Sequence, residues 1–296
     1  MVTRAALAAL TTALCLAPFS AAAAKKDQAG RPEALIFATA FGFYEGIAGT
    51  ILLAENDLIG GSSDTIAFGC LLTLATTGGT YALASHVTSK YGVNEAQGSM
   101  FNSSLLWGVL NGTGGGLALD VDAEQMLWST LVTGWTGQAV GILFAANVDR
   151  TAGQVGLMNT VGTWAAAETL LVMGIAEVDH WSTYATVGTL AVDLGLLAGA
   201  FVSSNGVLGR GVSQERTRLL DLGALAGGLA APAALFMVYG PEENLPQWYL
   251  TAVAIGIPAG IGTAWYLTRD YDQPGDEQAR DSAEQSFFLP LASGRF

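Results

Sequence analysis

The chain is poor in charge and has few of the residues that most catalytic and metal sites use. Only 12% of its 296 residues are charged, against about 25% in a typical soluble domain. It contains two histidines and two cysteines, Cys15 and Cys70. It has no GxSxG, HExxH, Walker or kinase motif, and His86 and His180 stand at the ends of different apolar segments. We therefore expect no enzyme activity, no cofactor and no metal site.

Positive charge is especially scarce, while apolar residues and glycine are abundant. The 12 Lys and Arg residues stand against 25 Asp and Glu residues, which gives a formal net charge of −13. This balance excludes nucleic-acid binding, since it repels phosphate and no basic stripe is present. With 51% hydrophobic residues, 38 glycines and no Gly-X-Y period, the chain is neither disordered nor collagen-like. The composition predicts a protein embedded in a lipid bilayer.

The first 24 residues have the three parts of a secretory signal peptide. Arg4 supplies the positive charge, residues 5–16 are apolar, and alanines at 22–24 form the small-residue exit. We predict a signal peptide at 1–24, followed by a short polar segment at 25–33; an uncleaved membrane anchor is the alternative. Leu14 argues against lipidation of Cys15, so Cys70 is expected to be the single cysteine of the mature chain.

Eight apolar segments follow, and each is long enough to cross a membrane as a helix. Short links join them, which predicts antiparallel neighbours and hence four helical hairpins. The sequence therefore predicts an all-α membrane protein with about eight transmembrane helices, a helical membrane domain at 34–268 and an acidic flexible tail at 269–296. The segments are Ala34–Ala54, Thr65–Thr88, Gly98–Leu119, Gln125–Asn147, Gly153–Ala176, Ser182–Ser203, Thr217–Tyr239 and Trp248–Thr268.

The four hairpins are weakly repeated. Thr39, Asn102, Asn159 and Asp221 fall at equivalent places, roughly 60 residues apart, and FNSSLLWG resembles MNTVGTWA. We expect these four residues to form a polar ring that either lines a passage or locks the bundle. Small residues also recur four positions apart, a spacing that lets helix backbones pack closely in lipid. We interpret the following glycines as packing residues: Gly42, Gly46, Gly108, Gly112, Gly116, Gly137, Gly141, Gly195, Gly199, Gly223, Gly227, Gly256 and Gly260.

A β-barrel is the alternative fold. The leader, the acidic charge and the terminal Phe296 are all typical of outer-membrane barrels. However, segments such as RLLDLGALAGGLAAPAALFMVYG lack the period-two alternation of strands and favour alanine and leucine over β-branched residues. The helical interpretation is therefore preferred.

Charge separates cleanly between the two ends of the predicted helices. With eight spans, every basic residue after the leader falls on one face, and the links on the other face contain only acidic charges. The positive-inside rule places the basic face in the cytoplasm, whereas a cleaved leader places it outside. We expect an integral protein of the bacterial cell envelope and leave open the choice between inner and outer membrane.

Four acidic residues fall inside the predicted spans, namely Glu45, Glu168, Asp193 and Asp221. Charges at membrane depth are costly and face a partner or a wet cavity. Together with Asn102 and Asn159, these acids form either an ion pathway, with Asp193 and Asp221 as transient ligands, or polar clamps between helices.

No motif points to a specific biochemical activity. We therefore expect a non-enzymatic structural or scaffold component of a membrane assembly. A transporter or channel that uses the intramembrane acids is the first alternative, and an outer-membrane pore is the second. The expected partner is the lipid bilayer, with other envelope proteins or further copies of the chain left open.

Overall fold

The computed structural model describes residues 27–56, 58–59, 62–147, 150–204, 212–240 and 246–272. These ranges contain eight helices and no strand, so the all-α prediction is confirmed and the β-barrel alternative is wrong for this part of the chain. The predicted signal peptide at 1–24 and most of the predicted tail, from 273 onward, lie outside the described residues. The helices are α2 (Arg31–Glu55), α3 (Ser62–Tyr91), α4 (Glu95–Ala118), α5 (Ala123–Asn147), α6 (Ala152–Ile175), α7 (Trp181–Ser204), α8 (Gln214–Tyr239) and α9 (Pro246–Leu267).

Within the described ranges, five of these helices, α2, α3, α7, α8 and α9, are long and apolar enough to cross a membrane. Helices α4, α5 and α6 have similar lengths but do not reach the same hydropathy. The lower hydropathy is plain in α4, where EAQGSMFNSSLLWGVLNGTGGGLA has six glycines among its 24 residues. The chain therefore has the helices of an integral membrane protein.

Several helices begin a turn before the predicted apolar segment because a polar residue caps them. Asn94 accepts a hydrogen bond from the Gln97 N–H, and the Gln97 side chain accepts one from the Asn94 N–H, which completes a capping box. Ser213 caps α8 in the same way, accepting from the Arg216 N–H. Apolar runs locate the lipid-facing part of a helix, whereas caps fix its true start.

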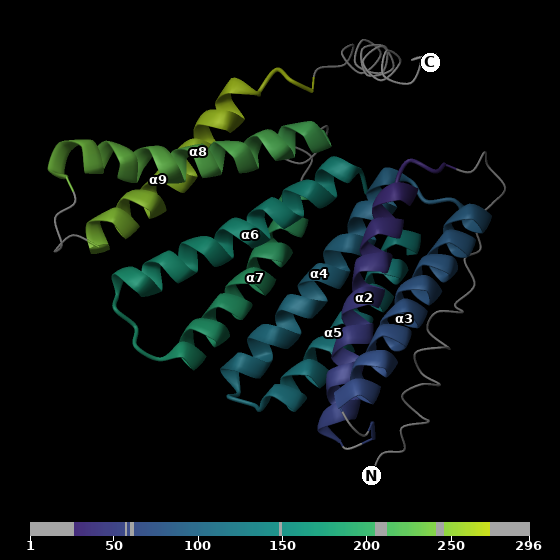
Figure 1. Cartoon of the computed structure of the whole chain (residues 1–296). Coiled ribbons are helices and arrows are strands. Elements are labelled where there is room, and N and C mark those ends of the chain that lie inside the picture. The colour runs from purple at the N-terminus through teal and green to yellow at the C-terminus, as the bar shows by residue number, and fades with distance from the viewer. Residues whose placement is uncertain are drawn as a thin grey trace, which may run out of the picture. The chain divides into compact units, whose positions relative to one another are not determined.

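The chain divides into two compact units. One contains residues 1–155 and 178–194, and the other contains residues 156–177 and 195–296. In the first unit, α2 packs on α3 and α4 packs on α5, with further contacts from α2 to α4 and α5 (Figure 1). In the second unit, α8 packs on α9, and the two helices cross at an angle (Figure 1). These three pairs match predicted hairpins of helices adjacent in sequence.

Glycines bring the two helices of the α8–α9 hairpin into backbone contact. A methyl group added to Gly260 would lie 2.0 Å from the Gly223 carbonyl oxygen, and one added to Gly227 would lie 2.1 Å from the Gly256 carbonyl oxygen. Distances below 3.0 Å leave no room for a side chain. The glycines at spacing four in both helices therefore form one close seam.

The other hairpins have the same kind of seam. A methyl group on Gly137 would lie 2.1 Å from the Ser104 carbonyl oxygen, which joins α4 to α5. A methyl group on Gly46 would lie 2.3 Å from the Thr73 Cα atom, which joins α2 to α3. In the second unit, a methyl group on Gly199 of α7 would lie 2.8 Å from the Met158 Cα atom of α6.

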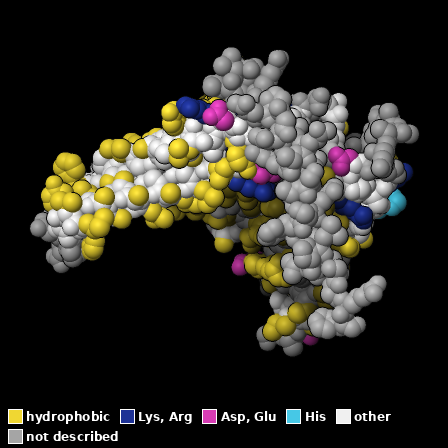
Figure 2. Space-filling model, turned by 90° about the horizontal axis from the view of Figure 1, so that it is seen from above, with side chains coloured by type: hydrophobic (Ala, Val, Ile, Leu, Met, Phe, Trp, Pro, Cys, Tyr) yellow, Lys and Arg dark blue, Asp and Glu magenta, His cyan; other side chains and the backbone are white. Residues whose placement is uncertain are grey.

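Most apolar side chains point away from the protein interior. In the most apolar window of each of the five candidate spans, between 6% and 33% of the residues are buried. Hydrophobic side chains lie over the outer surface of the helices (Figure 2). Such a surface is too apolar for water and suits hydrocarbon. Representative residues are Ile66, Leu71 and Leu74 of α3, Leu197 and Phe201 of α7, and Leu229 and Met237 of α8.

Candidate functional site

Glu45, half-buried on α2, is bonded to a tryptophan of the next hairpin. The indole Nε1–H of Trp135, on α5, donates a hydrogen bond to Glu45 Oε1. Trp135 also packs against a small apolar core formed by Ala48, Leu52 and Leu131. The carboxylate therefore lies at the edge of the contact between the first and second hairpins.

Asp193 has a partner from α4. The side-chain amide of Asn111 donates a hydrogen bond to Asp193 Oδ1 at 2.9 Å. The two helices approach closely beside this bond, because a methyl group on Gly114 would lie 2.1 Å from the Thr189 hydroxyl oxygen. Both residues belong to the first unit, since it includes α7 up to Leu194. This bond joins the second hairpin to the third.

Asp221, on α8, is bonded to α6 within the second unit. The indole Nε1–H of Trp164 donates to Asp221 Oδ1 at 2.9 Å. Two turns earlier on α6, a methyl group on Gly156 would lie 2.5 Å from the Thr217 hydroxyl oxygen of α8. This bond joins the third hairpin to the fourth.

The three contacts follow one pattern. Each carboxylate accepts a hydrogen bond from a neutral side chain that belongs to the adjacent hairpin. Two of these contacts lie within the first unit, and the third lies within the second. Glycine contacts occur both within hairpins and between them, whereas the three carboxylate contacts all lie between hairpins. Arranged in this way, the acids serve as links between helices.

Glu168 and Asn102 differ from these three acids. The Oε1 atom of Glu168, on α6, is buried and accepts no hydrogen bond. Asn102, on α4, is 4% exposed, and neither its side-chain oxygen nor its nitrogen has a partner. One turn before Asn102, the Ser99 hydroxyl donates to Glu33 Oε2 at 3.1 Å. Both residues are thus buried polar groups with unused bonding capacity.

Asp193 and Asp221 were predicted as transient ligands of an ion pathway or as polar clamps, and both alternatives stay predictions. The two acids belong to different units, and each has its own partner within its unit. The four residues of the predicted polar ring are likewise shared between the units, with Thr39 and Asn102 in one and Asn159 and Asp221 in the other. Thr39 donates to the Leu35 carbonyl oxygen of its own helix. The ring stays a prediction.

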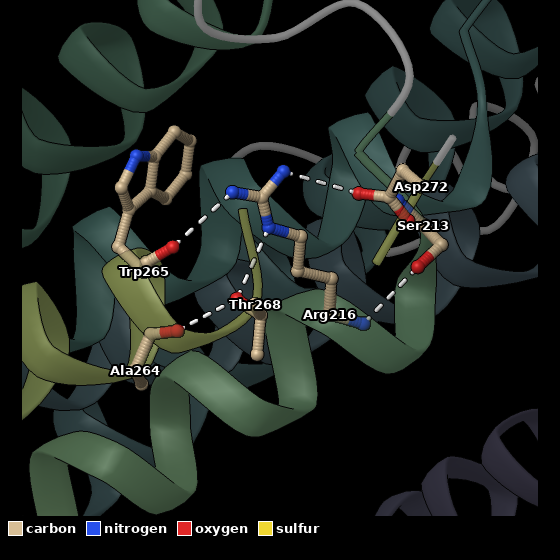
Figure 3. A network of polar contacts seen from close by, with 6 residues as sticks. All are labelled: Ser213, Arg216, Ala264, Trp265, Thr268 and Asp272. Atoms are coloured by element: carbon tan, nitrogen blue, oxygen red, sulfur yellow. Dashed lines mark hydrogen bonds and ion pairs between the residues drawn. The ribbon is translucent and has the colours of Figure 1, made fainter. Parts of the chain in front are cut away.

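A network around Arg216 closes the open end of the α8–α9 hairpin (Figure 3). The Arg216 guanidinium pairs with Asp272 at 3.2 Å and donates to the Thr268 hydroxyl at 3.2 Å. It also lies over the Trp265 ring, 4.3 Å from the ring centroid. Both charged side chains are nearly buried, with 9% and 11% of their surface exposed. Asp272 lies in the predicted tail, so its pairing was not foreseen from the sequence.

No family model, curated protein or solved structure matches this chain. Among the described residues, no group of three or more His, Cys, Asp or Glu side chains is placed to hold a metal ion. The features that bear on function are the polar contacts between helices and the exposed apolar surface.

Proposed function

We propose that this chain is a non-enzymatic structural component of a bacterial envelope membrane, with all eight helices crossing the bilayer. Five helices meet the requirements of length and hydropathy. Helices α4, α5 and α6 cross the same bilayer, because short links join them to their neighbours and they have about the same length. Packing against other helices compensates for their lower hydropathy.

The bonding of Glu45, Asp193 and Asp221 is the observation that carries the structural role. A conducting carboxylate must exchange its partner for an ion or a proton, whereas a structural one keeps its partner. Each of these three acids has a direct donor from an adjacent hairpin. In lipid, such bonds hold helices together because no water competes for the polar groups.

The membrane in which the protein resides follows from the fate of its leader. If the leader is cleaved, either the protein lies in the inner membrane with its basic face on the outer side, or it lies in an outer membrane. If the leader is retained, the positive-inside rule can hold. Sucrose-gradient fractionation combined with N-terminal sequencing distinguishes these arrangements.

Ion flux in proteoliposomes tests the structural role. We expect wild-type proteoliposomes to pass protons and potassium no faster than protein-free liposomes. We also expect Asp193→Leu and Asp221→Leu to reduce stability in detergent while leaving flux at this baseline. A wild-type flux that these substitutions abolish would contradict the proposal.

A conduit is the second candidate, and a stripe on α6 favours it. Thr160, Trp164 and Glu168 recur at spacing four and so lie along one face of the helix. The Thr160 hydroxyl and Glu168 Oε1 are buried without partners, on either side of the Trp164 bond to Asp221. If this face conducts protons, Glu168→Gln removes the flux. If the protein is structural, Glu168→Gln changes nothing in the flux assay.

A further inference from the structure

A polar cavity of about 260 Å³ opens where α4 begins and α5 ends. Its lining comes from the start of α4 with its cap residue, from the last turn of α5 and from Arg150 in the α5–α6 link. All of these residues belong to the first unit. Among the described residues that line it, Arg150 alone carries a charge. The lining consists of Asn94, Ala96, Gln97, Met100, Ala145, Ala146, Asn147 and Arg150.

The hydrogen bonds around this cavity occupy carbonyl groups at the end of α5. The last carbonyl groups of a helix carry partial negative charge and repel anions. Here the Gln97 amide donates to the Ala145 carbonyl at 3.1 Å, and the Asn147 amide donates to the Leu143 carbonyl at 2.7 Å. These bonds reduce the negative character of the α5 end, while Arg150 adds a guanidinium group to the lining. The cavity therefore suits an anion.

The surroundings of the cavity indicate a lipid as the source of that anion. Arg150 lies in a link on the predicted basic face, at the level where the helices leave the hydrocarbon. Large apolar side chains are exposed along the end of α5, with Val140 exposed by 42% and Leu143 and Phe144 by 51% each. A phospholipid presents the matching pair of groups, a phosphate at the boundary and acyl chains below it.

We propose that this cavity binds the phosphate group of a membrane phospholipid, with Arg150 as its cationic contact. Guanidinium and phosphate form charge-assisted, commonly bidentate hydrogen bonds, which makes arginine well suited to this task. The acyl chains lie along the exposed apolar end of α5. The proposal depends on the membrane insertion proposed above.

Lipid titration of the full chain in detergent tests this site. The delipidated protein is titrated with short-chain phosphatidylglycerol and, separately, with a diacylglycerol of the same chain length, and binding is read by native mass spectrometry. We expect Arg150→Gln to weaken phosphatidylglycerol binding by about tenfold or more. Ala146→Trp, which fills the cavity and keeps the arginine, is expected to do the same. The matched control is Arg269→Gln, an exposed arginine outside the cavity, which is expected to leave binding unchanged.

Three outcomes would overturn the lipid site. The first is wild-type affinity in both Arg150→Gln and Ala146→Trp, and the second is equal binding of diacylglycerol and phosphatidylglycerol. The third is competition by free glycerol 3-phosphate at the affinity of the lipid, which would indicate a soluble ligand. A carbonate wash of membranes separates this failure from that of the proposed function. If the wash releases the wild-type chain, the proposed membrane insertion is wrong. If the chain stays in the membrane and Arg150→Gln leaves its lipid affinity unchanged, only the lipid site is wrong.

Discussion

At the residue scale, the intramembrane carboxylates are explained by their partners. An acid in the middle of an apolar helix is destabilising unless a donor reaches it. Tryptophan provides that donor while presenting a large apolar ring to its other neighbours. Trp135 and Trp164 both act in this way, toward Glu45 and Asp221.

The Trp164 bond gives the first prediction. Trp164→Phe keeps a ring of similar shape but removes the N–H donor, so Asp221 loses its partner from α6. We expect the free energy of unfolding to fall by about 1 kcal/mol, the size of a typical hydrogen bond between membrane helices. Titration with SDS in mixed micelles measures this change.

The matched control is Trp248→Phe, because Trp248 is 63% exposed and belongs to the same unit. This control is expected to unfold like the wild type. Equal losses in the two variants would show that ring size matters and the bond to Asp221 does not.

The Asp193 bond gives the second prediction. Asp193→Asn retains an oxygen that accepts from Asn111, whereas Asp193→Leu does not. We therefore expect the asparagine variant to stay near wild-type stability and the leucine variant to lose about 1 kcal/mol. The same SDS titration measures both variants, and a stronger effect of asparagine than of leucine would argue against a link.

At the element scale, two kinds of contact hold the helices together, namely close glycine contacts and hydrogen bonds to carboxylates. Glycine seams hold the helices of one hairpin at backbone distance, and carboxylate bonds connect hairpins. The glycine seams require small residues at defined positions. Other glycines in the same helices have open space beside them, which provides internal controls.

The α8–α9 seam gives the third prediction. A methyl group on Gly260 meets the Gly223 carbonyl oxygen at 2.0 Å, whereas one on Gly262 meets nothing within 4 Å. We expect Gly260→Ala to destabilise the protein by about 1 to 3 kcal/mol through overpacking. Gly262→Ala is expected to be neutral or slightly stabilising, because alanine favours helix. Thermal unfolding in detergent compares the two, and equal midpoints would contradict the seam.

The Arg216 network gives the fourth prediction. Asp272→Asn leaves the nearly buried guanidinium without its ion pair, and we expect a loss of about 1 to 3 kcal/mol in the free energy of unfolding. Asp270→Asn is the control, since the Arg269–Asp270 pair is exposed by 57% and 71% and such pairs contribute little. Chemical unfolding of both variants provides the measurement. Similar behaviour of the two would show that Asp272 does not stabilise the hairpin end.

The helices were predictable because long apolar runs and short links specify them locally. The packing role of the glycines was predictable because their spacing of four is also a local feature of the sequence. The partners of the acids were not, because a contact such as Asn111 with Asp193 depends on how distant segments approach. The Arg216 pair was missed because Asp272 follows the last apolar segment and resembles the polar tail around it.

At the scale of the whole molecule, we propose that four hairpins cross a membrane. This arrangement places alternate links on opposite sides. The links after α3 and α5 belong to the basic side, and the links after α4 and α6 belong to the acidic side. Exposed residues in these links, or in the last helical turn before them, make the arrangement directly measurable.

Cysteine accessibility in sealed membrane vesicles is the most direct test. In a chain without Cys15 and Cys70, single cysteines replace Ser89 or Thr151 on the basic side and Asp122 or Asp179 on the acidic side. A membrane-impermeant maleimide is expected to label one pair in sealed vesicles and the other pair only after permeabilisation. Labelling of both pairs in sealed vesicles would contradict the eight-helix crossing.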